Sequence, residues 1–455
     1  MVLFYSQVSK KNVLQGENAI WETDWLASQI SAKDKRALRD ILARAARKGE
    51  FAFDPSHPHI PLAVPSYSLD EIMGAVDVLT SFKVTMGERV ARFEDKFSSY
   101  IGQKHGVMVN SGSSANLLAV SALTSPLHSS SIGEGFEAIV PAVTWATTMF
   151  PVNQCNGVPV LADVDGKNFL LTPKSVELAF SNHTRLLVPV HLLGSPCDVG
   201  TLTKNLERNS VTVLEDCCEA HGAEIGGHKV GSLGEVSTFS FYFSHHISTV
   251  EGGIVLTSNE ELAEIVRMLR AHGWTRDLRS KAKYQRLNPG IDPRYLFASP
   301  GYNLRPTEIQ AAFGLIQLKK LDGIVQARRR NASYLSKRLL EYSDVLTVQT
   351  EDKGVTHAWF GYPITVNNVA PFKRDELVRF LEGRGIETRP IMSGNLAEQP
   401  AVSLIRHRVS GNLQTARNVM RNSFFFGIHQ KLDRTALDYI IDSIGEFLRK
   451  RGRVS

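Results

Sequence analysis

Two adjacent histidines, His245 and His246, are the residues most suited to proton transfer in this chain. An imidazole can gain and lose a proton near neutral pH, because its unperturbed pKa is about 6.5. Ser240 lies five residues before His245, and Gly252 and Gly253 follow. Taken alone, His245 is more simply interpreted as a structural histidine, so a catalytic interpretation depends on the residues around it.

A short turn of small residues, 110–116, reads Asn-Ser-Gly-Ser-Ser-Ala-Asn and contains Gly112 and Ser113. It lies between a predicted strand and a predicted helix. Backbone N–H groups and hydroxyls at a helix amino terminus bind anions such as phosphate. Small-residue turns with a capping serine are also common without any ligand.

Three further side chains could hold a planar, charged ring. Trp145 follows an apolar run, and its indole face could stack on a heterocycle, although a core tryptophan is equally consistent. Asp216 lies at the end of the predicted strand 211–217, and Glu219 follows shortly after it. A carboxylate there could pair with a protonated ring nitrogen, but acids at strand ends are often only solvated.

Short β-branched runs alternating with helical segments predict that these residues sit on a largely parallel sheet. We expect seven strands, and ligands in such sheets bind beyond the carboxyl ends of the strands. The predicted strands are residues 106–111, 137–143, 158–164, 185–193, 211–217, 236–243 and 252–258.

The remaining sequence predicts three parts. Residues 1–65 form an amino-terminal extension with one helix (32–48) and a proline-rich connector, residues 66–325 a large domain, and residues 326–455 a smaller α+β domain. The small domain should contain a strand at 360–366 and helices at 373–385 and 433–451.

The composition favours a folded, water-soluble protein with a sizeable core. Hydrophobic residues make up 43% of the 455 residues and charged residues 22%. Arginine and lysine (52) only slightly exceed aspartate and glutamate (46), which argues against a nucleic-acid-coating protein. No apolar run approaches the roughly 20 residues that span a bilayer. With only four cysteines and no signal peptide, we expect a cytoplasmic protein without a disulfide framework or zinc site.

In this order and spacing, the turn, the tryptophan, the strand-end aspartate and the Ser240 to His245 segment resemble the DegT/DnrJ/EryC1/StrS family of pyridoxal-phosphate-dependent sugar aminotransferases, over roughly residues 65 to 450. The resemblance implies the aspartate-aminotransferase-like fold (fold type I), with a seven-stranded, mostly parallel sheet and a smaller C-terminal α+β domain.

One departure from the family pattern is decisive. Aminotransferases of this family carry a cofactor-binding lysine five residues after the serine, and His245 stands there instead. An imidazole lacks a primary amine and forms no stable Schiff base, but it can still act as a base. Lys229 lies sixteen residues upstream of His245 and is not expected to substitute.

A histidine at this position is typical of one subgroup of the family, the NDP-4-keto-6-deoxyhexose 3-dehydratases, which this sequence resembles. Segments 270–278, 300–306, 389–395 and 424–430 resemble the members that act on GDP-4-keto-6-deoxymannose. The resemblance implies pyridoxamine 5'-phosphate (PMP) and pyridoxal 5'-phosphate (PLP) as cofactor forms, glutamate as co-substrate, and a role in deoxysugar biosynthesis for lipopolysaccharide O-antigen.

The resemblance also assigns site residues. It implies that His245 is the catalytic base and that a neighbouring subunit of a homodimer contributes Asn303. The residues expected to bind the cofactor are Gly112, Ser113, Trp145, Asp216, Glu219, Ser240 and Asn303. The residues expected to bind substrate are His272, Arg276 and Arg389, for which surface salt bridges are an alternative. Glu219 stands where the family usually has glutamine, so its role is the least defined.

A sister branch of the subgroup binds a [2Fe–2S] cluster with cysteines shortly after the equivalent of Arg276. Residues 277–299 contain no cysteine, and such clusters need roughly four thiolates, so we expect no iron–sulfur cluster. Two other functions stay open at this point: an ordinary sugar aminotransferase with an unrecognised lysine, and a catalytically silent regulator of the same fold.

Overall fold

A computed structural model describes residues 30–46, 51–204, 206 and 211–451. Its centre is an eight-stranded sheet in the order β1-β9-β8-β5-β4-β2-β3-β14, in which every pairing is parallel except the two made by β9. The strands are β1 (His105–Val109), β2 (Glu137–Pro141), β3 (Val158–Ala162), β4 (Thr184–Leu187), β5 (Thr212–Asp216), β8 (Val236–Ser240), β9 (Gly253–Thr257) and β14 (Arg408–Val409).

All seven predicted strands belong to this sheet, and the aspartate-aminotransferase-like architecture is confirmed. Strands β3, β8 and β9 are buried along their whole length, as expected for a sheet covered on both faces. The eighth strand, β14, was not predicted, because two residues between irregular segments carry no periodic signal.

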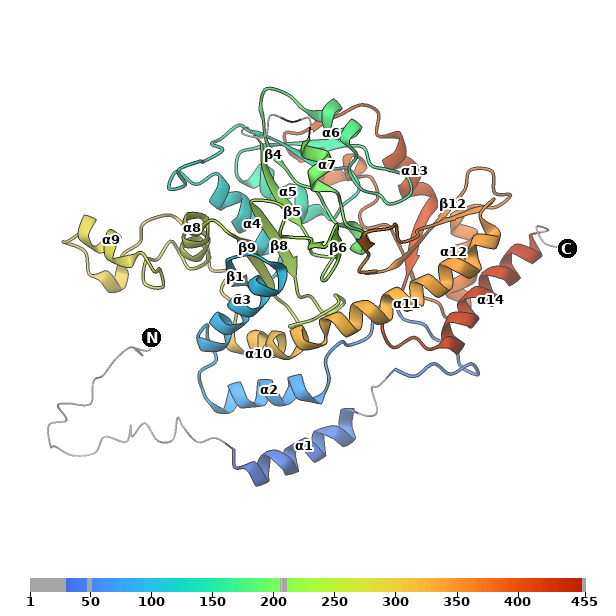
Figure 1. Cartoon of the computed structure of the whole chain (residues 1–455), viewed down its shortest axis with the longest axis horizontal. Helices are drawn as coiled ribbons and strands as arrows, with labels where there is room; N and C mark the ends of the chain where they lie inside the picture. Colours follow the sequence, from blue (N-terminus) through green and yellow to red (C-terminus); the bar gives the residue numbers. More distant parts are fainter. Residues whose placement is uncertain (1–29, 47–50, 205, 207–210, 452–455) are drawn as a thin grey trace.

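Helices cover both faces of the sheet (Figure 1). The apolar helix α4 packs on β8, β9, α5 and α8 and buries eight of its twelve residues. The helices before and around the sheet are α1 (Ala32–Ala46), α2 (Leu69–Thr80), α3 (Glu88–Ile101), α4 (Gly112–Leu123), α5 (Ala146–Gln154), α6 (Pro173–Ala179), α7 (Val199–Thr203), α8 (Glu260–Arg270) and α9 (Lys281–Leu287).

A second core surrounds a four-stranded antiparallel sheet in the carboxy-terminal part, in the order β10-β12-β15-β13. Its strands are β10 (Leu346–Val348), β12 (Tyr362–Val366), β13 (Thr388–Pro390) and β15 (Ser423–Phe426). Its helices are α11 (Leu321–Leu339), α12 (Arg374–Gly383) and α14 (Arg434–Lys450), while α13 (Gln414–Asn422) buries its apolar residues in the core of the large sheet. The predicted strand at 360–366 and both predicted helices are therefore present, while the boundaries 66–325 and 326–455 stay a prediction.

One long helical connection and one small sheet lie between these two parts. Helix α10 (Glu308–Gln317) leads through a short 3₁₀ turn into α11, and together they run along one side of the molecule (Figure 1). A small sheet pairs β6 (Glu224–Ile225) with β7 (His228–Lys229) and with β11 (Val355–Thr356). The short 3₁₀ helices are η3 (Leu192–Gly194), η4 (Pro293–Tyr295), η5 (Leu318–Lys320), η6 (Leu340–Tyr342), η7 (Leu396–Glu398) and η8 (Pro400–Leu404).

The predicted helix of the amino-terminal extension is present as α1, which pairs with α2 through Lys35–Asp77 and Arg39–Asp70. Residues 1–29 and 47–50 of the predicted extension and connector lie outside the described residues. Among the helices that the structure describes, none has the length and apolarity to cross a membrane.

Candidate active site

The sequence-predicted site lies at one edge of the large sheet. The parallel strands β1, β2, β5 and β8 all end there, and β9, which runs the other way, begins there. The turn after β1, the loop after β2, the last residue of β5 and the last residue of β8 are therefore brought together. This is the edge at which open α/β sheets bind ligands.

The small-residue turn forms the amino terminus of α4. Ser111 is its N-cap and accepts a hydrogen bond from the Ser114 N–H (3.1 Å). Gly112 lies directly against Ser240: a Cβ on Gly112 would lie 2.5 Å from the Ser240 Cβ. The glycine thus lets the amino terminus of the helix lie directly against the end of β8, and a helix amino terminus suits an anion.

Trp145 lies beside this turn as the N-cap of α5, and 58% of its surface is exposed. Ser113 on the turn shares a hydrogen bond of 3.0 Å with Thr147, two residues after the tryptophan. The indole is therefore exposed beside the turn and has not been absorbed into the core, which removes the alternative of a core tryptophan.

Asp216 is almost completely buried at the end of β5 and is held by three donors. Its Oδ2 accepts from Asn116 Nδ2 (2.9 Å) and Thr148 Oγ1 (2.8 Å), and its Oδ1 accepts from the Cys218 N–H (3.2 Å). Asn116 is itself fixed, because Thr238 donates to its Oδ1 at 2.6 Å. The sequence did not identify Asn116 and Thr148 as site residues, although both lie in the segments that predicted the turn and the tryptophan.

Glu219 lies three residues beyond Asp216 and accepts a hydrogen bond from the Leu193 N–H at 2.7 Å. Burial raises the pKa of its carboxyl to about 8, and the nearby Asp216 carboxylate raises it further. Glu219 is therefore largely protonated at neutral pH, so that, like the amide of glutamine, it can donate a hydrogen bond.

His245 is partly buried beside the same edge, and its imidazole contacts two aromatic rings edge-on, those of Phe360 (5.2 Å between centroids) and Tyr242 (6.0 Å). Its Nδ1 has no hydrogen-bond partner among the described residues. Burial lowers the pKa of His245 to about 3, and the positive charge of Arg328 contributes to this. The ring is therefore neutral at neutral pH, in the form that accepts a proton.

His246, the next residue, is fully buried and makes a hydrogen bond to the backbone. Its Nε2 donates to the Ala358 carbonyl at 2.8 Å, so this histidine has a structural contact that its neighbour lacks. Burial lowers its pKa well below the ordinary value.

The residues predicted to bind substrate lie apart from this cluster within one chain. His272 and Arg276 are exposed on the segment before α9, and Arg276 stacks on the Trp274 ring, 3.9 Å from its centroid. Arg389 is exposed on β13. Asn303 is exposed and accepts a hydrogen bond from Arg305 Nε at 3.0 Å.

The loop that carries Asn303 adjoins the anion-binding turn, because the Asn110 N–H donates to the Leu304 carbonyl at 3.1 Å. Within the part of the chain that the structure describes, the side chain of Asn303 bonds to Arg305 and to none of the clustered residues. The roles of these four residues stay predictions.

Lys229 does not enter the site. Its ammonium pairs with Glu224 (2.6 Å) and lies over the Tyr100 ring. Behind Asp216, the ligand atoms of His191, Glu215 and Cys217 lie within 4.8 Å of one another.

Glu215 is already satisfied there, because it accepts a hydrogen bond from His191 (3.0 Å) and three backbone N–H groups, those of Gly231, Leu233 and Gly234. This saturation favours a structural role for the group.

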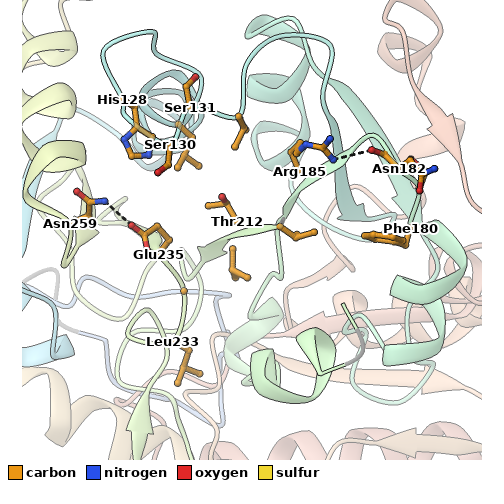
Figure 2. Close-up of a pocket in the computed structure, with 16 residues that line it drawn as sticks. His128, Ser130, Ser131, Phe180, Asn182, Arg185, Thr212, Leu233, Glu235 and Asn259 are labelled. Carbon is orange, nitrogen blue, oxygen red and sulfur yellow. Dashed lines mark hydrogen bonds between the residues drawn. The ribbon is translucent and has the colours of Figure 1, made fainter. Parts of the chain in front are cut away.

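A large open cavity of about 910 Å³ lies at the opposite edge of the sheet (Figure 2). Thr212, at the start of β5, lines it, whereas Asp216 ends the same strand. Polar side chains in its wall bond to their own neighbours, as Arg185 does to the Asn182 carbonyl and Asn259 to Glu235 (Figure 2). The cavity is thus separate from the predicted site.

Comparison with known proteins agrees with this geometry. Residues 67–445 match the model of the DegT/DnrJ/EryC1/StrS aminotransferase family. A GDP-4-keto-6-deoxy-D-mannose 3-dehydratase of Yersinia pseudotuberculosis is 37% identical over 82% of this chain and 94% of its own length. A dTDP-4-dehydro-2,6-dideoxy-D-glucose 3-dehydratase of Saccharopolyspora spinosa is 36% identical over 84% of this chain and 85% of its own length.

A solved structure of GDP-4-keto-6-deoxymannose 3-dehydratase with a trapped PLP–glutamate geminal diamine superimposes with a TM-score of 0.80. It is 34% identical, and the match covers 85% of this chain and all of that one (100%). The chain therefore belongs to the DegT/DnrJ/EryC1/StrS aminotransferase family, as the motifs predicted.

Proposed function

We propose that this family member catalyses the PMP-dependent C3 dehydration of an NDP-4-keto-6-deoxyhexose, with glutamate regenerating PMP, in deoxysugar biosynthesis. The observation that carries the proposal is His245, a neutral imidazole without a hydrogen-bond partner at Nδ1, at the position where the family's aminotransferases have a lysine. A base without a primary amine suits removal of a hydroxyl group better than transfer of an amine.

The residues present fit the cofactor. The close approach of Gly112 to Ser240 places a helix amino terminus, with Ser113 in its first turn, against the end of β8, where the phosphate would bind. Trp145 offers an exposed ring for stacking. Asp216, oriented by Asn116 and Thr148, would pair with a protonated ring nitrogen, and protonated Glu219 would donate to the ring hydroxyl oxygen.

When bound, the cofactor supplies a primary amine and a ring that accepts electrons. The chain supplies orientation and proton transfer. Asp216, whose carboxylate is oriented by three donors, would pair with a protonated ring nitrogen. His245 would accept a proton at an imidazole nitrogen and pass it to the departing hydroxyl, while the edge-on contacts with Phe360 and Tyr242 orient its ring.

The substrate side of the site is proposed from the sequence motifs. His272, Arg276 and Arg389 would contact the sugar, the nucleotide phosphates or the glutamate carboxylate, since arginine binds both kinds of anion in a fork. Asn303, which is exposed and next to the turn, would reach the cofactor of a neighbouring subunit, so that the enzyme is a homodimer. We also propose the cytoplasm as its location and lipopolysaccharide O-antigen as the destination of the product.

GDP-4-keto-6-deoxymannose is the first candidate substrate, supported by the Yersinia relative. Overall similarity does not select the nucleotide, because the dTDP-sugar dehydratase is almost as similar. Assaying GDP-, CDP- and dTDP-linked 4-keto-6-deoxyhexoses side by side, with PLP and glutamate, tests the proposal. Formation of a 4-keto-3,6-dideoxy sugar from one of them supports it, and formation of an amino sugar alone would show an aminotransferase.

A further inference from the structure

Arg328, on α11, is a buried cation outside the predicted site. Only 3% of its surface is exposed, and it forms no ion pair with a carboxylate in the part of the chain that the structure describes. Burial lowers its pKa to about 10, so it stays charged at neutral pH. An unpaired buried charge is unfavourable for stability, which suggests that this arginine serves another purpose.

Its guanidinium holds one short segment, residues 358–360. Nη1 donates to the Trp359 carbonyl (2.9 Å) and to the Phe360 carbonyl (3.0 Å). The segment is also anchored to the loop after β4, since Ala358 N–H donates to Gly194 O (2.9 Å) and Phe360 N–H donates to Leu193 O (2.8 Å).

Both histidines contact this segment. His246 donates to the Ala358 carbonyl, and the Phe360 ring packs edge-on against the His245 imidazole. The loop after β4, to which this segment is bonded, also contacts Glu219, because the Leu193 N–H donates a hydrogen bond to the Glu219 carboxyl group. Segment 358–360 therefore connects the proposed base with the carboxyl next to Asp216.

The backbone of this connection adopts uncommon conformations. Trp359 has φ +53° and Leu193 has φ +52°, values that side-chain-bearing residues rarely take. Gly194 is needed because a Cβ there would lie 2.6 Å from the Trp359 nitrogen. Such conformations persist only where surrounding contacts impose them, and Arg328 supplies two of these contacts.

We propose, on the basis of the proposed function, that Arg328 is a positioning residue for His245. Its guanidinium fixes segment 358–360, and with it the ring that holds the imidazole in place, while its charge opposes protonation of that imidazole. Arg328 needs no contact with substrate for this role.

The other groups around His245 are consistent with this assignment. His221 faces it with a centroid distance of 6.1 Å, Tyr242 lies on its own loop, and His246 follows it. Both other histidines have a pKa well below the ordinary value because of burial, so they are neutral at neutral pH. Among the groups that affect the pKa of His245, Arg328 is the charged one.

Three substitutions separate the hydrogen bonds from the charge. Arg328→Met removes both, Arg328→Gln keeps a donor without charge, and Arg328→Lys keeps a charge with a donor. Arg329→Met is the matched control, because this neighbour pairs with Glu351 and is more exposed (39% of its side chain).

The first readout is the pH titration of ¹³Cε1-labelled histidines by NMR in the cofactor-free protein, with the His245 signal assigned from His245→Asn. The second is kcat and KM for 3-deoxygenation.

We expect the His245 titration to move to higher pH in Arg328→Met and Arg328→Gln, and to stay near the wild-type position in Arg328→Lys and Arg329→Met. In Arg328→Met, kcat should fall by up to about 10²-fold with little change in KM, since a misplacement of about 1 Å costs this much. The acid limb of its kcat profile should move in the same direction as the NMR titration.

The proposal is wrong if Arg328→Met keeps the wild-type titration and kcat. If Arg328→Met does not fold, Arg328→Gln and Arg328→Lys decide, and equal His245 titrations in these two would overturn the charge effect. If the wild-type protein forms no 3-deoxy sugar, the proposed function fails, while the NMR comparison still tests the effect of Arg328 on His245.

Discussion

His245→Asn is the substitution that tests the proposed chemistry most directly. A general acid–base residue contributes typically 10²- to 10⁴-fold, so kcat should fall by this factor, equivalent to about 2.7 to 5.4 kcal/mol at about 1.36 kcal/mol per tenfold change. The effect on folding should be small. His245 Nδ1 has no partner to lose, and the ring contacts with Phe360 and Tyr242 account for about 0.5 to 1.5 kcal/mol each at most.

His246→Asn is the matched control and should show the opposite pattern. His246 is fully buried and donates to the Ala358 carbonyl, so the shorter side chain withdraws a donor and leaves a buried acceptor unpaired. This costs about 1 to 3 kcal/mol of unfolding free energy. Activity per folded molecule should change much less than in His245→Asn.

Product formation, cofactor absorbance and chemical unfolding of both variants decide between these patterns. His245→Asn should retain cofactor binding, because Trp145, Asp216 and the Gly112–Ser240 surface are unchanged. His245→Lys should also lose dehydration, and its new primary amine should allow glutamate-dependent formation of an amino sugar. Equal losses of activity in His245→Asn and His246→Asn, or a nearly active His245→Asn, would show that the base is assigned to the wrong residue.

Three further predictions concern the cofactor and the assembly. No iron should co-purify with the protein, because residues 277–299 contain no cysteine. Stoichiometric iron and sulfide in a metal analysis after anaerobic purification would contradict this. The active species should be a homodimer that shares its sites. A monomer that is fully active in sedimentation at assay concentration would count against this, and so would an unchanged PLP affinity in Asn303→Ala. The cofactor-free protein should lose stability as pH rises from about 4.5 through about 8, because Glu219 has a raised pKa in the folded state and must ionise while buried. Glu219→Gln should flatten this part of the stability profile, and an unchanged slope in thermal unfolding would refute the assignment.

Most of the large sheet could be predicted because its strands are apolar, β-branched runs of five residues or so separated by helices. Strand β14 could not, since Arg408 and Val409 form a strand only by pairing with Val160 and Leu161, about 250 residues earlier. The side chains around Asp216 show the same limit. Its donors Asn116 and Thr148 are 100 and 68 residues away in sequence, and only the fold brings them together.

The sequence spacing could select His245, five residues after Ser240, but it could not show why its neighbour is unsuited to the same task. The two rings differ in burial and in surroundings. His246 is fully buried and bonded through Nε2 to the Ala358 carbonyl, whereas His245 is only partly buried and its ring faces aromatic edges; the Nδ1 atoms of both rings lack a partner among the described residues. A base must be reachable by the proton it takes and must be held still while it does so. His245 meets the first condition through its partial exposure and the second through Phe360, whose carbonyl is held in turn by Arg328. The chemistry of this site therefore depends on a residue of α11 that no motif of the sequence identified.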